Sequence, residues 1–281
     1  MDALRAQRDG VAFTAALGLF LLAAPPVAWA QAPKATAPTP GISDNSFLLE
    51  EAYNQEFGVV QHISALSRFG PSDWIYTFTQ EWPVPGPTHQ LSVTVPLQGV
   101  EGARGLGDVA INYRYQVRDK NGIAIAPRLS LLVPTGSSSK GLGAGGTGLQ
   151  TNLALSLALG KAAVAHENLG ATWIPRAKDD VGDRARSLGL NAGQSVIWLV
   201  RPRFNALLEM AWTRGQEVVG PGRTARLDTL HLSPGVRWAY NFASGLQIVP
   251  GFAVPIGMGP SHGDTGVFLY LSFEHPFRRA K

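Results

Sequence analysis

From Gly58 to Phe277 the chain alternates large apolar residues with polar or small ones. In the clearest run, Val109, Ile111, Tyr113, Tyr115 and Val117 fall on one side, and Asp108, Ala110, Asn112, Arg114, Gln116 and Arg118 fall on the other. A period of two residues is typical of a β-strand whose faces meet two different environments. The same pattern recurs at 148–159 and 227–240, so the sequence predicts a largely β structure.

Turn-forming residues separate these runs and divide the region into about twelve predicted strands. They lie near 58–66, 73–83, 89–98, 106–118, 122–134, 148–159, 162–174, 187–200, 203–213, 227–240, 245–256 and 265–277. Glu167 and Gln194 interrupt the alternation, which indicates bulges or register changes in the seventh and eighth strands.

The predicted connections alternate in length, and the longer ones are polar or rich in glycine. These longer connections are 135–147, 175–186, 214–226 and 257–264. Barrels of the bacterial outer membrane have short periplasmic turns and longer outer loops in this order. We therefore predict an all-β fold, an antiparallel up-and-down transmembrane β-barrel over residues 58–277, with both termini in the periplasm.

The N-terminal region changes composition twice before the barrel begins. Residues 1–30 have a basic start, an apolar core and a small-residue cleavage motif, which predicts a cleaved signal peptide. Residues 31–57 begin as a linker rich in Ala, Pro and Thr. Within them, 43–56 is both apolar and acidic, and Asn45 or Ser46 could cap a short helix there. That segment either enters the lumen as a plug or rests on the periplasmic rim, and we favour the rim.

The last strand predicts a partner in assembly. Residues 266–277 alternate and end on Phe277, which resembles the C-terminal signal that outer-membrane barrels present to the barrel-assembly machinery. The short basic tail 278–281 departs from that signal, which usually stops at the aromatic residue.

Composition limits the other partners and the compartment. Charged residues are only 16% of the chain, yet the part after residue 30 has no apolar run of about 18 residues that could form a membrane helix. A barrel remains compatible, and outer-membrane lipid is then a partner. The net charge of +4 is small and evenly spread, which argues against nucleic acid. The chain has no cysteine and hence neither disulfides nor thiolate chemistry.

The inward-facing positions supply the candidate functional residues. The lumen-lining candidates are Asp108, Arg114, Arg118, Arg128, His166, Glu209, His231, Arg237, Tyr270 and Glu274. Their opposed charges could select polar solutes across an open lumen, or form a salt-bridged network that fills it. His231 and Ser233 share a face and could form a hydrolytic pair, but the sequence places no group to orient the histidine. We therefore predict no enzymatic activity, no catalytic or metal-binding residues, and no cofactor.

Two stretches carry a resemblance to a known family. Residues 45–63, from Asn45 to Ile63, and residues 105–116, from Gly105 to Gln116, resemble the outer-membrane barrels of the MetA-pathway of phenol degradation (transporter-like) family. The resemblance implies a location in the outer membrane of a Gram-negative bacterium and passage of small molecules, with aromatic compounds as one class. The alternatives are a structural or adhesin-like barrel that does not transport, and a barrel hydrolase.

Overall fold

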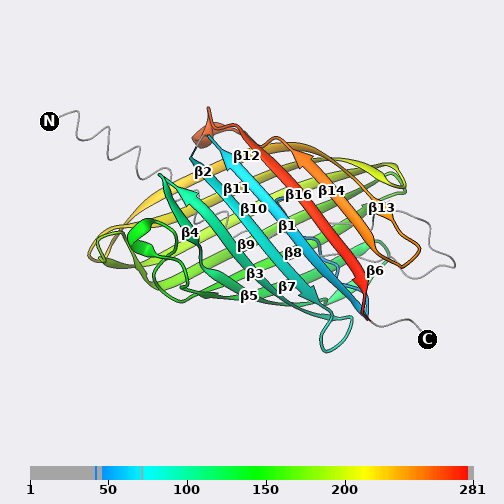
Figure 1. Ribbon diagram of the computed structural model, residues 1–281, viewed down its shortest axis with the longest axis horizontal. Helices are drawn as coiled ribbons and strands as arrows, with labels where there is room; N and C mark the ends of the chain where they lie inside the picture. The colour runs from blue at the N-terminus through cyan, green and yellow to red at the C-terminus, as the bar shows by residue number, and fades with distance from the viewer. Residues whose placement is uncertain (1–41, 43–45, 71, 278–281) are drawn as a thin grey trace.

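The computed structural model describes Ile42, residues 46–70 and residues 72–277, and it forms a closed barrel of twelve long antiparallel strands (Figure 1). The long strands are β1 (Val59–Phe69), β2 (Asp73–Trp82), β3 (His89–Val100), β5 (Val109–Tyr115), β7 (Ile123–Val133), β8 (Gly148–Leu159), β9 (Ala163–Lys178), β10 (Arg184–Arg201), β11 (Phe204–Gly220), β12 (Arg223–Trp238), β14 (Gln247–Ala253) and β16 (Gly266–Pro276). The predicted signal peptide, most of the linker and the basic tail lie outside the described residues.

Shorter pieces complete the wall and its connections. They are β4 (Ala103–Leu106), β6 (Arg118–Lys120), β13 (Tyr240–Asn241), β15 (Ile256–Gly257) and the 3₁₀ turns η1 (Ser138–Lys140) and η2 (Gly259–Ser261). Each long strand pairs with its neighbour in the chain, and β16 pairs with β1 to close the ring. The predicted fold and strand number are confirmed. No helix among the described residues is long and apolar enough to cross a membrane.

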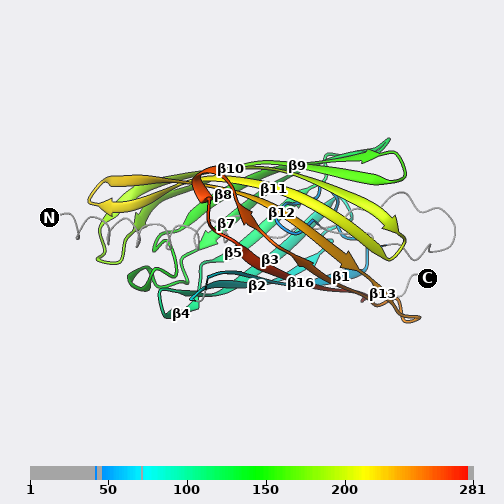
Figure 2. The ribbon, with the colours of Figure 1, turned by 90° about the horizontal axis from the view of Figure 1, so that it is seen from above.

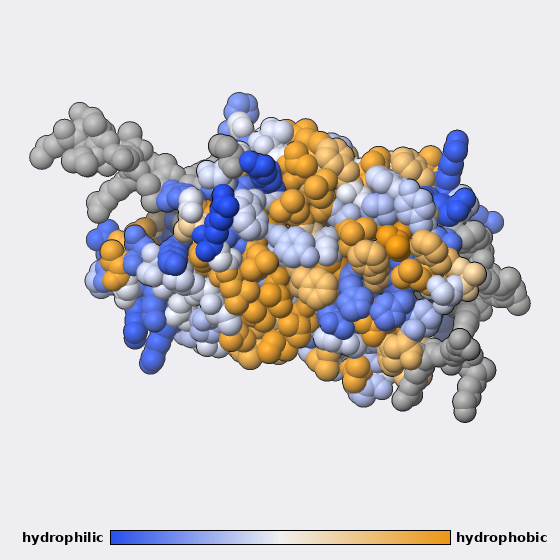
Figure 3. Space-filling view, in the orientation of Figure 1, coloured by the Kyte–Doolittle hydropathy of each residue, from blue (hydrophilic) through white to orange (hydrophobic). Residues whose placement is uncertain are grey.

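The two faces of the wall have opposite chemistry, because successive side chains of a strand point to opposite sides. On β5, Ile111, Tyr113 and Tyr115 are exposed on the outside, while Asn112 and Arg114 are buried inside. On β8, Leu149 and Leu153 are exposed, and the inward residues between and beyond them are buried. Apolar side chains gather across the middle of the visible outer face (Figure 3). This apolar belt is the surface that a membrane barrel presents to lipid.

The strands extend farther at one end of the barrel than at the other, and we name each end for the part of the chain found there. The terminus end is where β1 begins and β16 ends, and the loop end is opposite. At the loop end β9 to β12 are 16 to 18 residues long, and their hairpins project beyond the other strands (Figure 2). The predicted loops at 175–186 and 214–226 contain the turns but are too long, because the strands reach Lys178, Arg184, Gly220 and Arg223. The strand residues in these stretches continue the hydrogen-bonded ladder. They lie beyond the apolar belt, so they have no apolar face from which alternation could predict a strand.

The predicted irregularity at Glu167 and Gln194 is also wrong. The two residues pair in regular register on the outer face, where the Gln194 Nε2 donates to the Glu167 Oε1 at 2.6 Å. The register of β10 shifts elsewhere, between Ala185 and Ser187 and again near Arg201. A polar residue on the lipid side was thus mistaken for a change of register.

Candidate functional site: the occupied lumen

Residues 46–57, the lumen segment, lie inside the barrel. Ile42 marks the entry at the terminus end, where its N–H donates to the carbonyl of Pro202 at 2.8 Å. From Ser46 to Gln55 almost every side chain is buried, and the chain then turns at Gly58 into β1. The segment contains bends but no helix, so the predicted short helix is wrong. The favoured position on the rim is wrong as well, because the wall surrounds the segment.

The segment first contacts β10 and β11. The hydroxyl of Ser46 donates to that of Ser195 at 2.6 Å. The backbone N–H groups of Phe47 and Leu48 both donate to the carboxylate of Glu209, at 2.9 and 3.0 Å. A carboxylate that accepts two backbone N–H groups satisfies donors that would otherwise be buried without partners. Glu209 therefore anchors the entry of the segment.

The middle of the segment bonds to β9 and β8. Glu50 and Asn168 form a reciprocal pair, in which the Glu50 N–H donates to the Asn168 Oδ1 at 2.8 Å and the Asn168 Nδ2 donates to the Glu50 carbonyl at 2.7 Å. The N–H of Ala52 donates to the hydroxyl of Ser156 at 2.9 Å. Wall side chains thus replace the neighbouring strand that an extended backbone would otherwise need.

The last part of the segment bonds to β5, β3 and β1. Arg114 donates to the Asn54 Oδ1 at 2.9 Å and to the carbonyls of Glu51 and Tyr53. The N–H of Gln55 donates to the Gln90 Oε1 at 2.8 Å, and its side chain bonds to Gln61. The segment therefore crosses the lumen from one side of the wall to the other.

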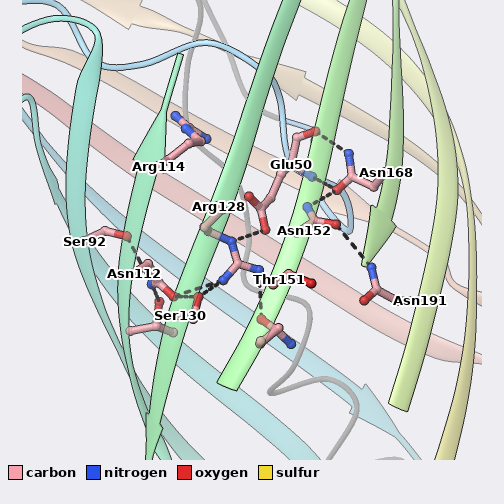
Figure 4. Close-up of polar contacts among 12 residues, drawn as sticks. Glu50, Ser92, Asn112, Arg114, Arg128, Ser130, Thr151, Asn152, Asn168 and Asn191 are labelled. Atoms are coloured by element: carbon pink, nitrogen blue, oxygen red, sulfur yellow. Dashed lines mark hydrogen bonds and ion pairs between the residues drawn. The ribbon is translucent and has the colours of Figure 1, made fainter. Parts of the chain in front are cut away.

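Arg128 joins the segment to a polar network of the wall (Figure 4). Its Nε lies 2.7 Å from the Glu50 Oε1, a buried ion pair. Its other nitrogens donate to Asn112 at 3.1 Å, to Gln150 at 2.8 Å and to Ser130. The planar guanidinium can satisfy several acceptors at once, so the pair is buried without orphaned arginine donors.

An apolar pocket in the wall holds the ring of Phe47. The ring centroid lies 5.3 Å from that of Phe268 and 5.1 Å from that of Tyr270. The other members of the cluster are Ile63, Ala65, Ile197, Leu207, Ala239, Val249 and Ala253. A Cβ at Gly251 would overlap the ring, so the pocket exists because this position is glycine.

A serine–histidine pair also occurs in the lumen, but not the pair that the sequence suggested. Ser156 Oγ lies 2.8 Å from the His166 Nδ1, and the His166 Nε2 lies 3.5 Å from the Glu51 Oε1. All three side chains are almost fully buried, and the Ser156 hydroxyl already accepts the Ala52 N–H. This arrangement holds the segment and leaves no space for a substrate at the hydroxyl.

The remaining lumen candidates fall at other levels of the barrel. His231 is buried with its ring 5.1 Å from that of Phe69, and no hydrogen bond joins it to Ser233. Arg237 faces inward and is fully buried, while Glu274 faces inward at the terminus end, paired in register with Gln61. The expectation of no enzymatic activity stays a prediction.

Asp108 lies at the loop end and fixes the connection between β7 and β8. Its carboxylate accepts the N–H groups of Gly136 at 2.9 Å and Ala144 at 2.7 Å. Burial raises the pKa of this carboxyl, although the two N–H donors act to lower it. Asp108 therefore shapes an outer loop and does not touch the lumen segment.

Arg118 is not a lumen residue. It lies on β6 and pairs with Ile125, whose face points outward, and it is exposed. The strand breaks after Tyr115, so the alternation of β5 does not continue unchanged into β6. The prediction failed because it continued the inward–outward alternation of β5 across that break.

The lumen is filled at the level of the segment. Water inside an open channel would leave its wall exposed, yet the inward side chains here are at most 3% exposed: Gln61, Gln90, Asn112, Arg114, Ser130, Ser156, His166, Ser195 and Glu209. A cavity of about 20 Å³ remains beside Glu50, Arg128 and Asn168, which is room for about one water. In the described part of the chain, no group of three potential metal ligands lies close enough to hold an ion.

Comparison with known proteins supports the fold. No protein-family model matches the chain, and no curated protein matches it either. Among solved structures, an outer membrane channel from Pseudomonas putida superposes with a TM-score of 0.64 at 12% identity, covering 80% of this chain and 97% of that chain. The NanC porin superposes with a TM-score of 0.52 at 10% identity, covering 77% of this chain and 98% of that chain. The chain has the fold of outer-membrane channel barrels.

At these identities the likeness establishes the architecture alone, and membership of the phenol-degradation family stays a prediction. The sequence missed several residues that hold the segment, among them Ser156, Asn168 and Gln90. Each occupies an inward position of its strand, so the alternation of side chains along the strand could have placed them in the lumen. Their partners in the segment lie 35 to 118 residues away, and alternation contains no signal for such contacts.

Proposed function

We propose that this protein is an outer-membrane channel for small molecules, in which the lumen segment is a displaceable constriction. The observation that carries the proposal is that a separate stretch of chain fills a polar lumen through hydrogen bonds to wall side chains. A barrel meant only as a solid support could fill its interior with apolar side chains from its own strands, as packed small barrels do.

Displacement requires no change in the wall. The strands make their ladder bonds with one another, and the segment bonds mainly to side chains that project from them, with one bond from Asn54 to the carbonyl of Pro87 in a turn. The segment continues directly into β1 through Gly58, whose positive φ of 83° makes the turn. It can therefore leave the lumen toward the terminus end while the barrel stays closed.

The lumen wall suggests which solutes would pass. Its Asn, Gln, Ser and Thr side chains and its arginines offer hydrogen bonds to polar groups. The pocket now filled by Phe47 offers an apolar surface with two aromatic rings. Together these features favour small molecules with an apolar ring and a polar group, which include simple aromatic acids and alcohols.

The apolar belt supports insertion in a membrane, and we place the terminus end in the periplasm, the orientation usual for this architecture. In that orientation β16 faces the barrel-assembly machinery during export, and solute enters from the loop end. The location in the outer membrane rests on these physical features and on the shared fold.

A reversible disulfide between the lumen segment and the wall tests the proposal. The chain has no cysteine, and the Oγ atoms of Ser46 and Ser195 are 2.6 Å apart, so cysteines at both positions are within reach of a disulfide. Oxidised Ser46→Cys/Ser195→Cys protein in planar bilayers should show lower conductance than the same protein after reduction. Ser46→Cys alone is the matched control, and its conductance should not respond to the redox state.

Deletion of residues 46–56 tests the same idea without a crosslink. We expect higher conductance from a barrel that still inserts and still shows heat-modifiable migration on gels. A barrel that stays sealed in both experiments would instead favour the structural or adhesin-like alternative.

A further inference from the structure

Three exposed arginines project outward from the β9–β10 hairpin at the loop end. They are Arg176, Arg184 and Arg186. On β10 the buried neighbours Ala185 and Ser187 face inward, so alternation places Arg184 and Arg186 on the outer face. On β9, Arg176 is exposed between the buried residues Ile174 and Ala177.

A bulge brings two of them together. Ala185 pairs with Ala177 and Ser187 pairs with Ile174, so Arg186 on β10 lies opposite Pro175 and Arg176 on β9. Like charges directly opposite one another destabilise a sheet. Neither side chain has an ion-pair or hydrogen-bond partner within the described residues, and the same is true of Arg184.

In the neighbouring β11–β12 hairpin, the charges of two arginines are compensated by a carboxylate. There Asp228 lies 2.7 Å from Arg214 and 2.6 Å from Arg226, so one carboxylate serves both arginines. The acidic residues nearest the cluster on the β9–β10 hairpin are in its turn, where the carboxylate of Asp179 accepts the N–H of Asp183 at 2.7 Å. Glu167 lies farther along β9, where it accepts a hydrogen bond from Gln194. Among the described residues, no carboxylate therefore forms an ion pair with the arginine cluster.

The cluster stands directly above the apolar belt. Trp173 on β9 and its partner Leu188 on β10 lie next to the cluster, on the side nearer the belt, and each is 45% exposed. In a membrane barrel, exposed aromatic residues at the edge of the belt lie at the level of the lipid headgroups. The guanidinium groups are then at the height of lipid phosphates, which the planar Arg fork binds in bidentate fashion.

We propose that Arg176, Arg184 and Arg186 form a binding site for the phosphate groups of an anionic lipid in the leaflet around the loop end. Trp173 packs against the upper part of its acyl chains. The site rests on the membrane orientation given under the proposed function, but it does not depend on whether the lumen conducts.

Lipid binding to the folded barrel in detergent micelles tests the site. The probes are a bisphosphorylated lipid A and the same lipid without phosphates, followed by native mass spectrometry. We expect Arg176→Ala/Arg184→Ala/Arg186→Ala to weaken binding of the phosphorylated lipid by about 100-fold, at roughly fivefold for each basic residue near a charged lipid surface. Binding of the phosphate-free lipid should change little.

The matched control removes charge at the opposite end. Arg201 and Arg203 are exposed at the terminus end, and Arg201→Ala/Arg203→Ala should bind the phosphorylated lipid as the unmodified protein does. If the triple variant loses heat-modifiable folding, Arg176→Ala/Arg186→Ala serves in its place, with an expected loss of about 25-fold.

Three results would overturn the proposal. They are equal binding of the two lipids, equal loss in the control variant, and displacement of the lipid by millimolar inorganic phosphate, which would identify a site for free anions. Conductance of the triple variant is measured in parallel. Lost lipid binding with unchanged conductance supports the lipid site whatever the outcome for the channel.

Discussion

At the scale of single residues, two of the contacts that hold the segment in the lumen can be tested separately. Gly251 provides the space for the Phe47 ring, and Arg128 neutralises Glu50 in the interior. One contact is steric and the other electrostatic, so each can be changed without altering the segment itself.

Gly251→Leu should expel the segment while leaving the barrel intact. A leucine side chain would occupy the space of the Phe47 ring, and overpacking of a filled site costs about 1–3 kcal/mol. We expect higher conductance and faster proteolysis near residues 46–57. Ala243→Leu, at the exposed turn of the same hairpin, is the control for an enlarged side chain away from the Phe47 ring. Unchanged conductance in Gly251→Leu would show that Phe47 does not govern access.

Arg128→Met should destabilise the occupied lumen more than the double variant Arg128→Met/Glu50→Gln. Removal of one partner leaves a buried charge without compensation, which costs about 3–5 kcal/mol. The double variant removes both charges and should recover part of that loss. Denaturant titration of the segment, followed by an environment-sensitive fluorophore at position 46, measures the difference. Equal losses in the two variants would show that the ion pair contributes nothing.

At the scale of the strand, alternation predicted most of the fold. It placed Ile111 and Tyr113 outside and Asn112 and Arg114 inside, because a transmembrane strand must satisfy lipid on one face and the lumen on the other. It failed at the strand ends within 175–186 and 214–226, which extend beyond the lipid and have no apolar face to reveal them. It also missed the lumen segment, whose bonds join residues far apart in the chain.

Leu153→Arg tests the lipid face of β8. Leu153 is 47% exposed on the outer surface, and an arginine near the middle of the hydrocarbon costs about 2–4 kcal/mol. We expect a lower denaturant midpoint for the folded barrel in lipid vesicles. Leu153→Met keeps the size and the apolar character, and it should have little effect. A tolerated arginine would place this position outside the hydrocarbon region.

At the scale of the whole molecule, we expect the barrel wall to be more stable than the lumen segment inside it. The wall ladder is continuous around the ring, whereas the segment is held by side-chain bonds and by the apolar contacts of Phe47 and Ala52. Units held by fewer cooperative bonds open locally with smaller free energies than the global unfolding.

Hydrogen exchange should distinguish local opening of the lumen segment from global unfolding of the barrel wall. The amides of Phe47, Glu50, Ala52 and Gln55 are hydrogen-bonded, so we expect protection from exchange, but less than that of wall amides on β8 and β9. Mass spectrometry of the vesicle-embedded protein would detect the difference. Identical rates for segment and wall would mean that the segment opens only when the barrel unfolds.

The order in which bonds of the lumen segment can form has a consequence for biogenesis. Ser46 bonds to Ser195, and Phe47 bonds to Glu209, across 149 and 162 residues of chain. These anchors arise only after β10 and β11 have been delivered, and β1 must wait for β16 before the ring closes. The N-terminal part of the described chain therefore reaches its final position among the last.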